Sequence, residues 1–231
     1  MIKIENTDVH GFGAAFRGMR NPKNSWDKSD SPYVITDPII DPVLKLDVPV
    51  LGQNDLKLAQ TLANAGDDHG KFMRMITVTC DITAPLYWWK NADTYKVGTV
   101  ADSCSTMHKI HAKEFTIDDF SHEHLTEEIV QVSWDDQEYT DAALDHLYDT
   151  VGILNAYRDK YLETKDKRYW WQLIQLLPSS YNQKRTWMGN YQVLKRIYFA
   201  RKDHKLDEWH TFCYWIESLP YAKELMGIDN G

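Results

Sequence analysis

Residues 84–109 read APLYWWKNADTYKVGTVADSCSTMHK, and they gather aromatic, polar and hydroxyl side chains into one short stretch. A strand is predicted immediately before them, since apolar and polar residues alternate over residues 76–83. These residue types indicate a small-molecule pocket at the end of the strand. They leave open whether the pocket performs chemistry.

A helix is predicted to follow the strand and to run through Tyr95. Thr83 is suited to its N-cap position and Pro85 to its first turn. At helical spacing, Trp88, Asn91 and Tyr95 share one face. The aromatic side chains could stack on a flavin or a base, or they could belong to the core or to a subunit interface, which is the more frequent role of such clusters.

The whole chain has the composition of a globular protein and is predicted to form one domain, residues 1–231. Its net charge of −8 argues against binding to a nucleic-acid polymer. Three cysteines without a repeated spacing suggest neither a disulfide framework nor a zinc motif. Because no signal peptide and no membrane-spanning run is visible, we expect a cytoplasmic protein without a membrane partner.

Outside the opening stretch, the patterns predict mostly helices. The first four residues alternate as a short strand would, and residues 11–20 form a compact turn. Residues 21–52 are predicted to be a long surface excursion broken by Pro22, Pro32, Pro38, Pro42 and Pro49. Asn54 or Asp55 is suited to cap a helix that ends at Gly66. Further helices are predicted at 139–161, 169–177, 181–201 and 206–219.

The predicted helix 181–201 carries a stripe of four residues, Asn190, Leu194, Ile197 and Arg201. Its two polar ends lie roughly 16 Å apart along the helix axis, a span that suits a ligand larger than one ring. Arg201 would bind an anionic ligand or an internal carboxylate. Asn190 would contact the ligand or be a satisfied core amide. The surrounding segment attracts anions, because seven basic residues, Lys184, Arg185, Lys195, Arg196, Arg201, Lys202 and Lys205, stand against one acid, Asp203.

Four other groups invite functional interpretations beside simpler ones. Ser105 would hydrogen-bond a phosphate or pyrimidine, or cap a loop. Cys104 would be a nucleophile only if its thiolate were activated, and Lys96 is the one nearby cation. Two further groups are better explained without ligands. Four histidines lack a known metal-ligand spacing, namely His108, His111, His122 and His124. An acidic run is typical of a helix start and a solvated face, and it consists of Asp135, Asp136 and Glu138.

Two blocks of the sequence resemble the flavin-dependent thymidylate synthases, about residues 54–109 and 173–218, and GAAFRGMRNPKNSW near the start resembles them more loosely. In that family a strand ends in Ala-Pro and leads to Arg-Gln, to an Arg-His-Arg triplet and to Ser-x-Arg-Tyr. Here Ala84-Pro85, Ser105 and His69 keep this frame. Later, Leu177-Pro178 matches the family's Leu-Pro, and Glu208-Trp209 stands near its Gln-Trp-Glu.

Cationic residues of the family are changed in the first block and, at one position, in the second. Arg-Gln becomes Lys90-Asn91, the triplet becomes Thr94-Tyr95-Lys96, Arg-Tyr becomes Met107-His108, and an expected arginine is Ile174. Tyrosine and threonine donate hydrogen bonds but bring no fixed charge. The resemblance therefore leaves two alternatives: either the ligand differs from the family's, or the activity is lost.

The resemblance implies an α+β fold, a helix-rich domain with a small sheet, assembled as a homotetramer. It implies an enzyme that methylates or otherwise modifies dUMP or a related pyrimidine nucleotide, with FAD as cofactor and NADPH and methylenetetrahydrofolate as co-substrates. Asn91, Ser105 and Arg201 would bind the nucleotide; Tyr95, Lys96, Asp102, Asn190 and His204 would border the flavin; Ser105 and Lys96 would be catalytic. No metal is expected. The alternative is an inactive nucleotide-binding or structural homologue, and a third possibility is a flavin-free enzyme that depends on Cys104.

Overall fold

The computed structural model describes residues 2–32, 50–134 and 137–228, and these form two compact units. Unit 1 comprises Thr83–Ala92 and Ser103–Lys184, and unit 2 comprises Ile2–Ile82, Asp93–Asp102 and Arg185–Gly231. No helix among the described residues combines the length and the apolar character needed to cross a membrane.

A four-stranded sheet has the order β1-β2-β6-β3. Its strands are β1 (Lys3–His10), β2 (Thr77–Pro85), β6 (Asn182–Asn190) and β3 (Val100–Ser103). The alternation predicted for β2 is confirmed, because Val78, Cys80 and Ile82 are buried while their neighbours are half-exposed. Burial in this apolar strand raises the pKa of the Cys80 thiol to about 12, so the thiol stays neutral and serves packing.

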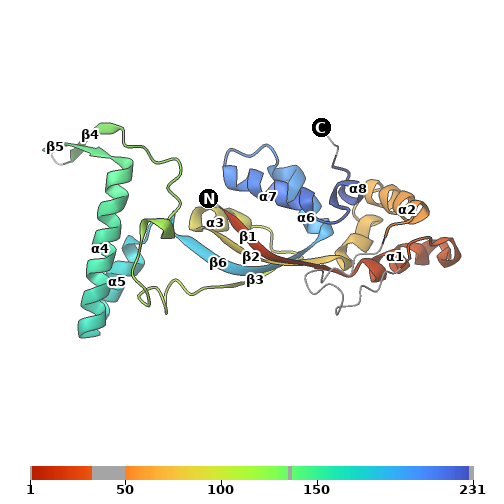
Figure 1. The fold of residues 1–231 in the computed structure, drawn as a ribbon, viewed down its shortest axis with the longest axis horizontal. Helices are drawn as coiled ribbons and strands as arrows, with labels where there is room; N and C mark the ends of the chain where they lie inside the picture. Colours follow the sequence, from red (N-terminus) through yellow and green to blue (C-terminus); the bar gives the residue numbers. More distant parts are fainter. Residues whose placement is uncertain (1, 33–49, 135–136, 229–231) are drawn as a thin grey trace. The chain divides into compact units, whose positions relative to one another are not determined.

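Helices cover one side and one end of the part of the sheet that belongs to unit 2. In Figure 1, α6 and α7 lie over one side of the strands, while α1, α2 and α8 gather near one end. These helices are α1 (Phe12–Arg20), α2 (Gln53–Asn64), α6 (Tyr191–Arg201), α7 (Asp207–Ser218) and α8 (Ala222–Met226), with 3-10 helices at Asn21–Lys23, Trp26–Lys28 and Gly70–Met75. Phe12 of α1 packs edge-on against Tyr191 of α6, with ring centroids 5.6 Å apart.

The start of α2 differs from the prediction, because neither Asn54 nor Asp55 is its N-cap. The helix begins at Gln53 after Gly52, and the carboxylate of Asp30 accepts hydrogen bonds from the backbone N–H groups of Asn54 and Asp55. The Asp55 side chain is fully buried and pairs with Arg20, whose Nε lies 2.6 Å from Asp55 Oδ1. A residue from another segment thus supplies the cap, which local sequence cannot reveal.

Unit 1 is built around two packed helices. These are α4 (Ala143–Thr164) and α5 (Lys167–Leu176), accompanied by α3 (Leu86–Ala92), a 3-10 helix at Ile117–Asp119, and a hairpin of β4 (Ile129–Trp134) and β5 (Gln137–Ala142). Its core contains Ile110, Phe115, Phe120, Leu147, Leu154 and Leu173. Ile174 packs against this core, so the position where the family has an arginine is apolar for a structural reason.

The predicted helix 181–201 is wrong in its first half, because residues 182–190 form strand β6. Gln183, Trp187 and Gly189 are buried and Arg185 is half-buried, so the inward side follows the two-residue period of a strand. The Trp187 ring lies over Gly189, where a Cβ atom would stand 2.2 Å from it. Only the second half of the predicted helix is helical: α6 begins at Tyr191, with Asn190 as its N-cap, and ends at Arg201.

Two further boundaries were predicted wrongly. β2 continues to Pro85 and α3 begins at Leu86, so Thr83 is not its cap. The first N–H groups of α3, on Leu86 and Tyr87, donate to the carbonyl groups of Tyr181 and Ser179 instead. The long helix α4 begins at Ala143, and residues 139–142, predicted as its first turn, belong to β5.

Some predictions fall on residues outside the described ranges. Pro38, Pro42 and Pro49 of the surface excursion lie there, as do Asp135 and Asp136 of the predicted helix start. Glu138 is described, and it lies exposed in strand β5 rather than at a helix start.

Candidate functional site

Arg201 is the centre of the candidate site, at the last residue of α6. Its Nε donates a hydrogen bond of 2.8 Å to the hydroxyl of Tyr95. Its guanidinium carbon lies 5.4 Å from the centroid of the Tyr95 ring and 4.9 Å from that of Trp209. The two rings stand nearly perpendicular, at 71°. The cation is therefore fixed by two aromatic side chains.

No aspartate or glutamate of the described chain forms an ion pair with Arg201, and its Nη1 and Nη2 have no hydrogen bond to any described residue. The internal carboxylate, one of the two alternatives for this residue, is therefore not found in that part of the chain. A half-buried, immobilised guanidinium with two nitrogens available is suited to an oxyanion such as phosphate.

His204 adds a second hydrogen-bond donor to this cluster. Its backbone N–H donates to the carbonyl of Arg201, and its ring lies 6.3 Å from that of Trp209. Nδ1 accepts from the backbone N–H of Leu206 at 3.1 Å, so Nε2 carries the proton of the neutral ring. Desolvation and the nearby Arg201 and His210 lower the pKa of His204, which keeps the ring neutral at pH 7.

Asn190 is the N-cap of α6. Its Oδ1 accepts a hydrogen bond of 3.0 Å from the backbone N–H of Val193. Gly98 packs against it in the left-handed conformation, at φ +85°, where an added Cβ would meet Asn190 Nδ2 at 3.0 Å. The capping oxygen is thus already used, and Nδ2, which has no hydrogen bond to any described residue, is the group that Asn190 can offer to a ligand.

Asn190→Ala is expected to lower the free energy of unfolding by about 0.5–2 kcal/mol, because it removes this cap. Chemical denaturation followed by circular dichroism measures the change. Asn190→Asp is the matched control, since it keeps the capping oxygen and should retain most of the stability. Equal stability of Asn190→Ala and the unaltered chain would show that the cap contributes nothing.

Four further residues were predicted to belong to the site, namely Asn91, Lys96, Asp102 and Ser105. Lys96 and Asp102 belong to unit 2 and are exposed, and their side chains form no hydrogen bond or ion pair with any described residue. Asn91 and Ser105 belong to unit 1. Ser105 Oγ accepts from the backbone N–H groups of Met107 and His108, at 3.3 and 2.8 Å, as the loop-capping interpretation requires. The ligand roles of these four residues remain predictions from the resemblance.

The tryptophans of the opening stretch are core residues. Trp88 and Trp89 are each 1% exposed, with ring centroids 4.8 Å apart, so they are not placed to stack on a ligand. α3 ends at Ala92, and Tyr95 therefore does not continue the face that carries Trp88 and Asn91. Cys104 is exposed, and its backbone N–H and carbonyl pair with Lys184 and Gln183.

Three of the seven basic residues of the basic segment have structural partners. Arg185 pairs with Asp93 at 2.7 Å, Arg196 pairs with Asp67, and Lys195 donates to the carbonyl of Ala63 at 3.0 Å. Arg201 differs from them because its described partners are aromatic. The sequence pattern could not separate the structural cations from this one.

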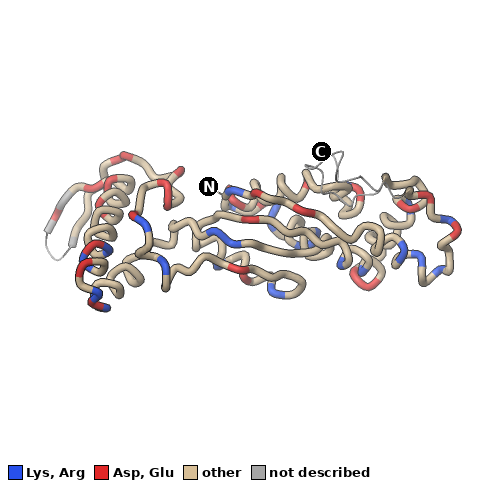
Figure 2. The backbone as a smooth tube through the Cα atoms, turned by 60° about the horizontal axis from the view of Figure 1, so that its bottom comes forward, with Lys and Arg blue, Asp and Glu red and all other residues tan. Residues whose placement is uncertain are grey.

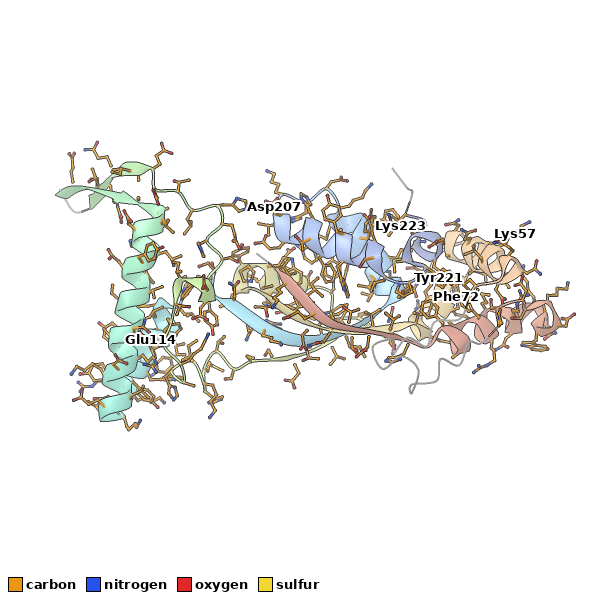
Figure 3. All side chains as sticks on the ribbon, viewed as in Figure 1. Lys57, Phe72, Glu114, Asp207, Tyr221 and Lys223 are labelled. Atoms are coloured by element: carbon orange, nitrogen blue, oxygen red, sulfur yellow. The ribbon has the colours of Figure 1, made fainter. Side chains whose placement is uncertain are left out.

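Unit 2 contains a cavity of about 790 Å³, which was not among the sites predicted from the sequence. Its described lining combines apolar side chains with basic ones and one acid, and consists of Gly18, Met19, Pro22, Lys23, Leu62, Asp68, His69, Lys71, Phe72, Arg74 and Met75. Phe72, one of the lining residues, is labelled in Figure 3. The only sequence signal for this cavity was His69 and the GMRNP segment of the family resemblance.

No family model matches the chain, and no curated protein sequence matches it. Solved structures do. Thymidylate synthase X (ThyX) from Helicobacter pylori, crystallised with FAD and dUMP, is 14% identical, with a TM-score of 0.64 over 98% of this chain and 97% of that one. A second structure of the same enzyme with FAD and dUMP is 15% identical, with a TM-score of 0.64 over 97% of each chain. The UMP/dUMP methylase PolB from Streptomyces cacaoi, bound with 5-Br dUMP, is 13% identical, with a TM-score of 0.56 over 98% of this chain and 94% of that one. The fold is thus the predicted one, a helix-rich α+β fold like that of the flavin-dependent thymidylate synthases.

Proposed function

We propose that this chain is a divergent member of the flavin-dependent thymidylate synthase family that binds dUMP or a related pyrimidine nucleotide through Arg201 and methylates or otherwise modifies it. The observation that carries the proposal is the Arg201 cluster, a fixed cation with two available nitrogens in a fold whose solved neighbours contain dUMP or 5-Br dUMP. The protein would act in the cytoplasm as a homotetramer. Large exposed aromatic side chains on α5 and α7, such as Trp171 and Tyr214, support assembly.

In this proposal each member of the cluster has a separate task. Arg201 binds the nucleotide phosphate with its Nη nitrogens, because a guanidinium matches the geometry of two phosphate oxygens. Tyr95 is a positioning residue that holds Arg201 through its hydroxyl. His204 donates from Nε2, and Asn190 from Nδ2, to acceptor atoms of the bound molecules.

The described residues also fit an FAD cofactor. The apolar cavity, with Phe72 and Met75 in its lining and His69 and Lys71 among its polar residues, has the volume and character of a site for a flat ring system with an anionic tail. The resemblance implies that Lys96 and Asp102, which are exposed, would border the flavin together with Tyr95, Asn190 and His204, and these five residues lie outside the described lining of the cavity. When bound, FAD supplies redox chemistry, with NADPH as reductant and methylenetetrahydrofolate as the one-carbon donor.

A second candidate function is nucleotide binding without catalysis. It is favoured by the residues that stand at the positions of the family's Arg-His-Arg triplet. The Tyr95 hydroxyl already accepts a hydrogen bond from Arg201, and Thr94 brings no positive charge. Only Lys96 retains a cation there, and it is exposed. Electrostatic stabilisation of charge on the pyrimidine would be weaker than in the family.

Arg201→Gln is expected to weaken dUMP binding about 10–100-fold, since a charge-assisted hydrogen bond contributes about 1.5–3 kcal/mol. Isothermal titration calorimetry with dUMP measures the affinity. Lys202→Gln is the matched control, because Lys202 is the next residue, is exposed and has no described partner. Equal loss in both variants, or no loss in Arg201→Gln, would contradict the role of Arg201.

The two candidate functions are separated by the cofactor. A flavin spectrum after purification or after adding FAD, and flavin oxidation that requires methylenetetrahydrofolate and dUMP, would support the enzyme. A protein that binds dUMP, but neither binds FAD nor rescues a thymidine auxotroph, would be the non-catalytic module. A protein that binds neither would overturn both candidates.

A further inference from the structure

A second cavity of unit 2 lies over the buried side chain of Arg20. Its volume is about 540 Å³, and its described lining consists of Arg20, Lys23, Ser25, Lys28, Asn54 and Leu58. These residues come from the end of α1, from the segment that follows it, and from the first turns of α2. Figure 2 shows blue segments, which mark lysine and arginine, at the right of the picture, where α1 lies in Figure 1. None of the described lining residues is acidic.

Arg20 has an unused donor at this cavity. Its side chain is 4% exposed. Nε pairs with Asp55, and Nη1 donates to the carbonyl of Ser25 at 3.1 Å. Nη2 is buried and has no hydrogen-bond partner among the described residues. A buried guanidinium nitrogen without an acceptor is costly, and such groups are usually satisfied by a water molecule or a ligand.

The carboxylates nearby are already occupied. Asp55 Oδ1 accepts from Arg20, while its Oδ2 accepts from Ser29 Oγ and from the backbone N–H groups of Asp30 and Ser31. The Asp30 carboxylate accepts from the start of α2. Asp55 thus offsets the charge of Arg20, and the side chains of the two lysines of the lining form no hydrogen bond or ion pair with a described residue.

We propose that this cavity is a second anion site, which binds a phosphate group through Arg20 Nη2, Lys23 and Lys28. A compact oxyanion supplies the missing acceptor for Nη2 and neutralises the two lysines together. The Ser25 hydroxyl and the Asn54 amide add polar groups at the same wall. The site is distinct from the Arg201 cluster. Its existence does not require the function proposed above, although Lys23 also lines the larger cavity.

Calorimetric titration of the full chain with inorganic pyrophosphate, and separately with ADP, tests this site. Both titrations use the Arg201→Gln background, so that binding at the Arg201 cluster does not contribute. Lys23→Gln/Lys28→Gln is expected to weaken binding at least about tenfold, because two of the three cations are removed. Lys28→Gln alone should also weaken binding, and it leaves the lining of the larger cavity unchanged, because, of the two cavities, Lys28 lines only the one above Arg20. Arg20 itself is left unchanged, since its loss would expose Asp55 as an unpaired buried charge.

The matched control is Lys57→Gln. Lys57 lies exposed on α2 and outside the cavity lining (Figure 3), and its removal should leave the affinity unchanged. Binding of pyrophosphate alone identifies a site for the free anion, and binding of ADP identifies a site for an organic phosphate. The proposal is overturned if neither binds, or if the double variant binds as tightly as the Lys57→Gln control.

Discussion

Asp55→Ala is expected to destabilise the protein by about 3–5 kcal/mol, because it leaves the Arg20 guanidinium buried without its counter-charge. The loss is not limited to the ion pair. Asp55 also accepts from Ser29 Oγ and from the backbone N–H groups of Asp30 and Ser31, and these donors would lose their acceptor. Urea denaturation of the two proteins at pH 7 measures the difference.

Arg20→Met/Asp55→Leu tests which of these contributions dominates. Replacing both charges with apolar groups removes the unpaired cation but still leaves the donors of residues 29–31 without Asp55. The double variant should therefore recover only part of the stability. Full recovery would mean that the ion pair alone accounts for the effect, and a loss below about 1 kcal/mol in Asp55→Ala would contradict the buried pair.

The pH dependence of stability should report the same carboxylate. Burial by itself raises the pKa of Asp55, but hydrogen bonds from Ser31, Ser29 and Arg20 outweigh burial and hold it below its ordinary value. A depressed pKa in the folded state means that the ionised carboxylate stabilises the fold above about pH 4. This contribution is lost as the pH falls through the folded-state pKa, and the loss should be absent in Asp55→Ala.

Trp89→Ala is expected to cost about 3–5 kcal/mol, the usual range for removing a fully buried tryptophan. Trp89 is 1% exposed, and its Nε1 donates to the carbonyl of Gln183 at 2.9 Å. The substitution therefore creates a cavity and leaves a buried carbonyl without this donor. The midpoint of thermal unfolding, followed by near-ultraviolet circular dichroism, measures the effect.

Trp171→Ala is the matched control within unit 1. Trp171 is 45% exposed on α5, and Lys167 Nζ lies 5.7 Å from its ring. An exposed cation–π contact contributes only about 0.5–1 kcal/mol, so this variant should lose little stability. Similar losses in both variants would show that the buried position of Trp89 has no special importance.

The parts of the fold that could be predicted are those in which local sequence and tertiary structure agree. Strand β2 was recognisable because its alternation matches the burial of its two faces. Residues 182–190 were not, since polar side chains dominate a strand whose burial is set by Trp187 and Gly189. Asp30 caps α2 from a residue 24 positions away, and such a contact has no signature in the helix itself.

For the candidate site, the sequence singled out Arg201, but it did not reveal which residues surround Arg201 in the folded chain. Arg201 was recognised because a cation on an apolar helical stripe needs a partner. The partners themselves, Tyr95 and Trp209, come from segments far apart in sequence, and only the folded chain brings them together. The two cavities of unit 2 were missed for the same reason, because their walls combine residues of α1, α2 and the segments around them.

Lys23 contributes to the walls of both cavities. An anion bound above Arg20 would neutralise part of the charge that Lys23 presents to the larger apolar cavity, and an anionic group bound there would do the same in reverse. Thermodynamic linkage requires the two effects on affinity to be equal. Through this one lysine, binding of an anionic ligand in one cavity would lower the affinity of the other cavity for a second anionic ligand, although the two ligands occupy different sites.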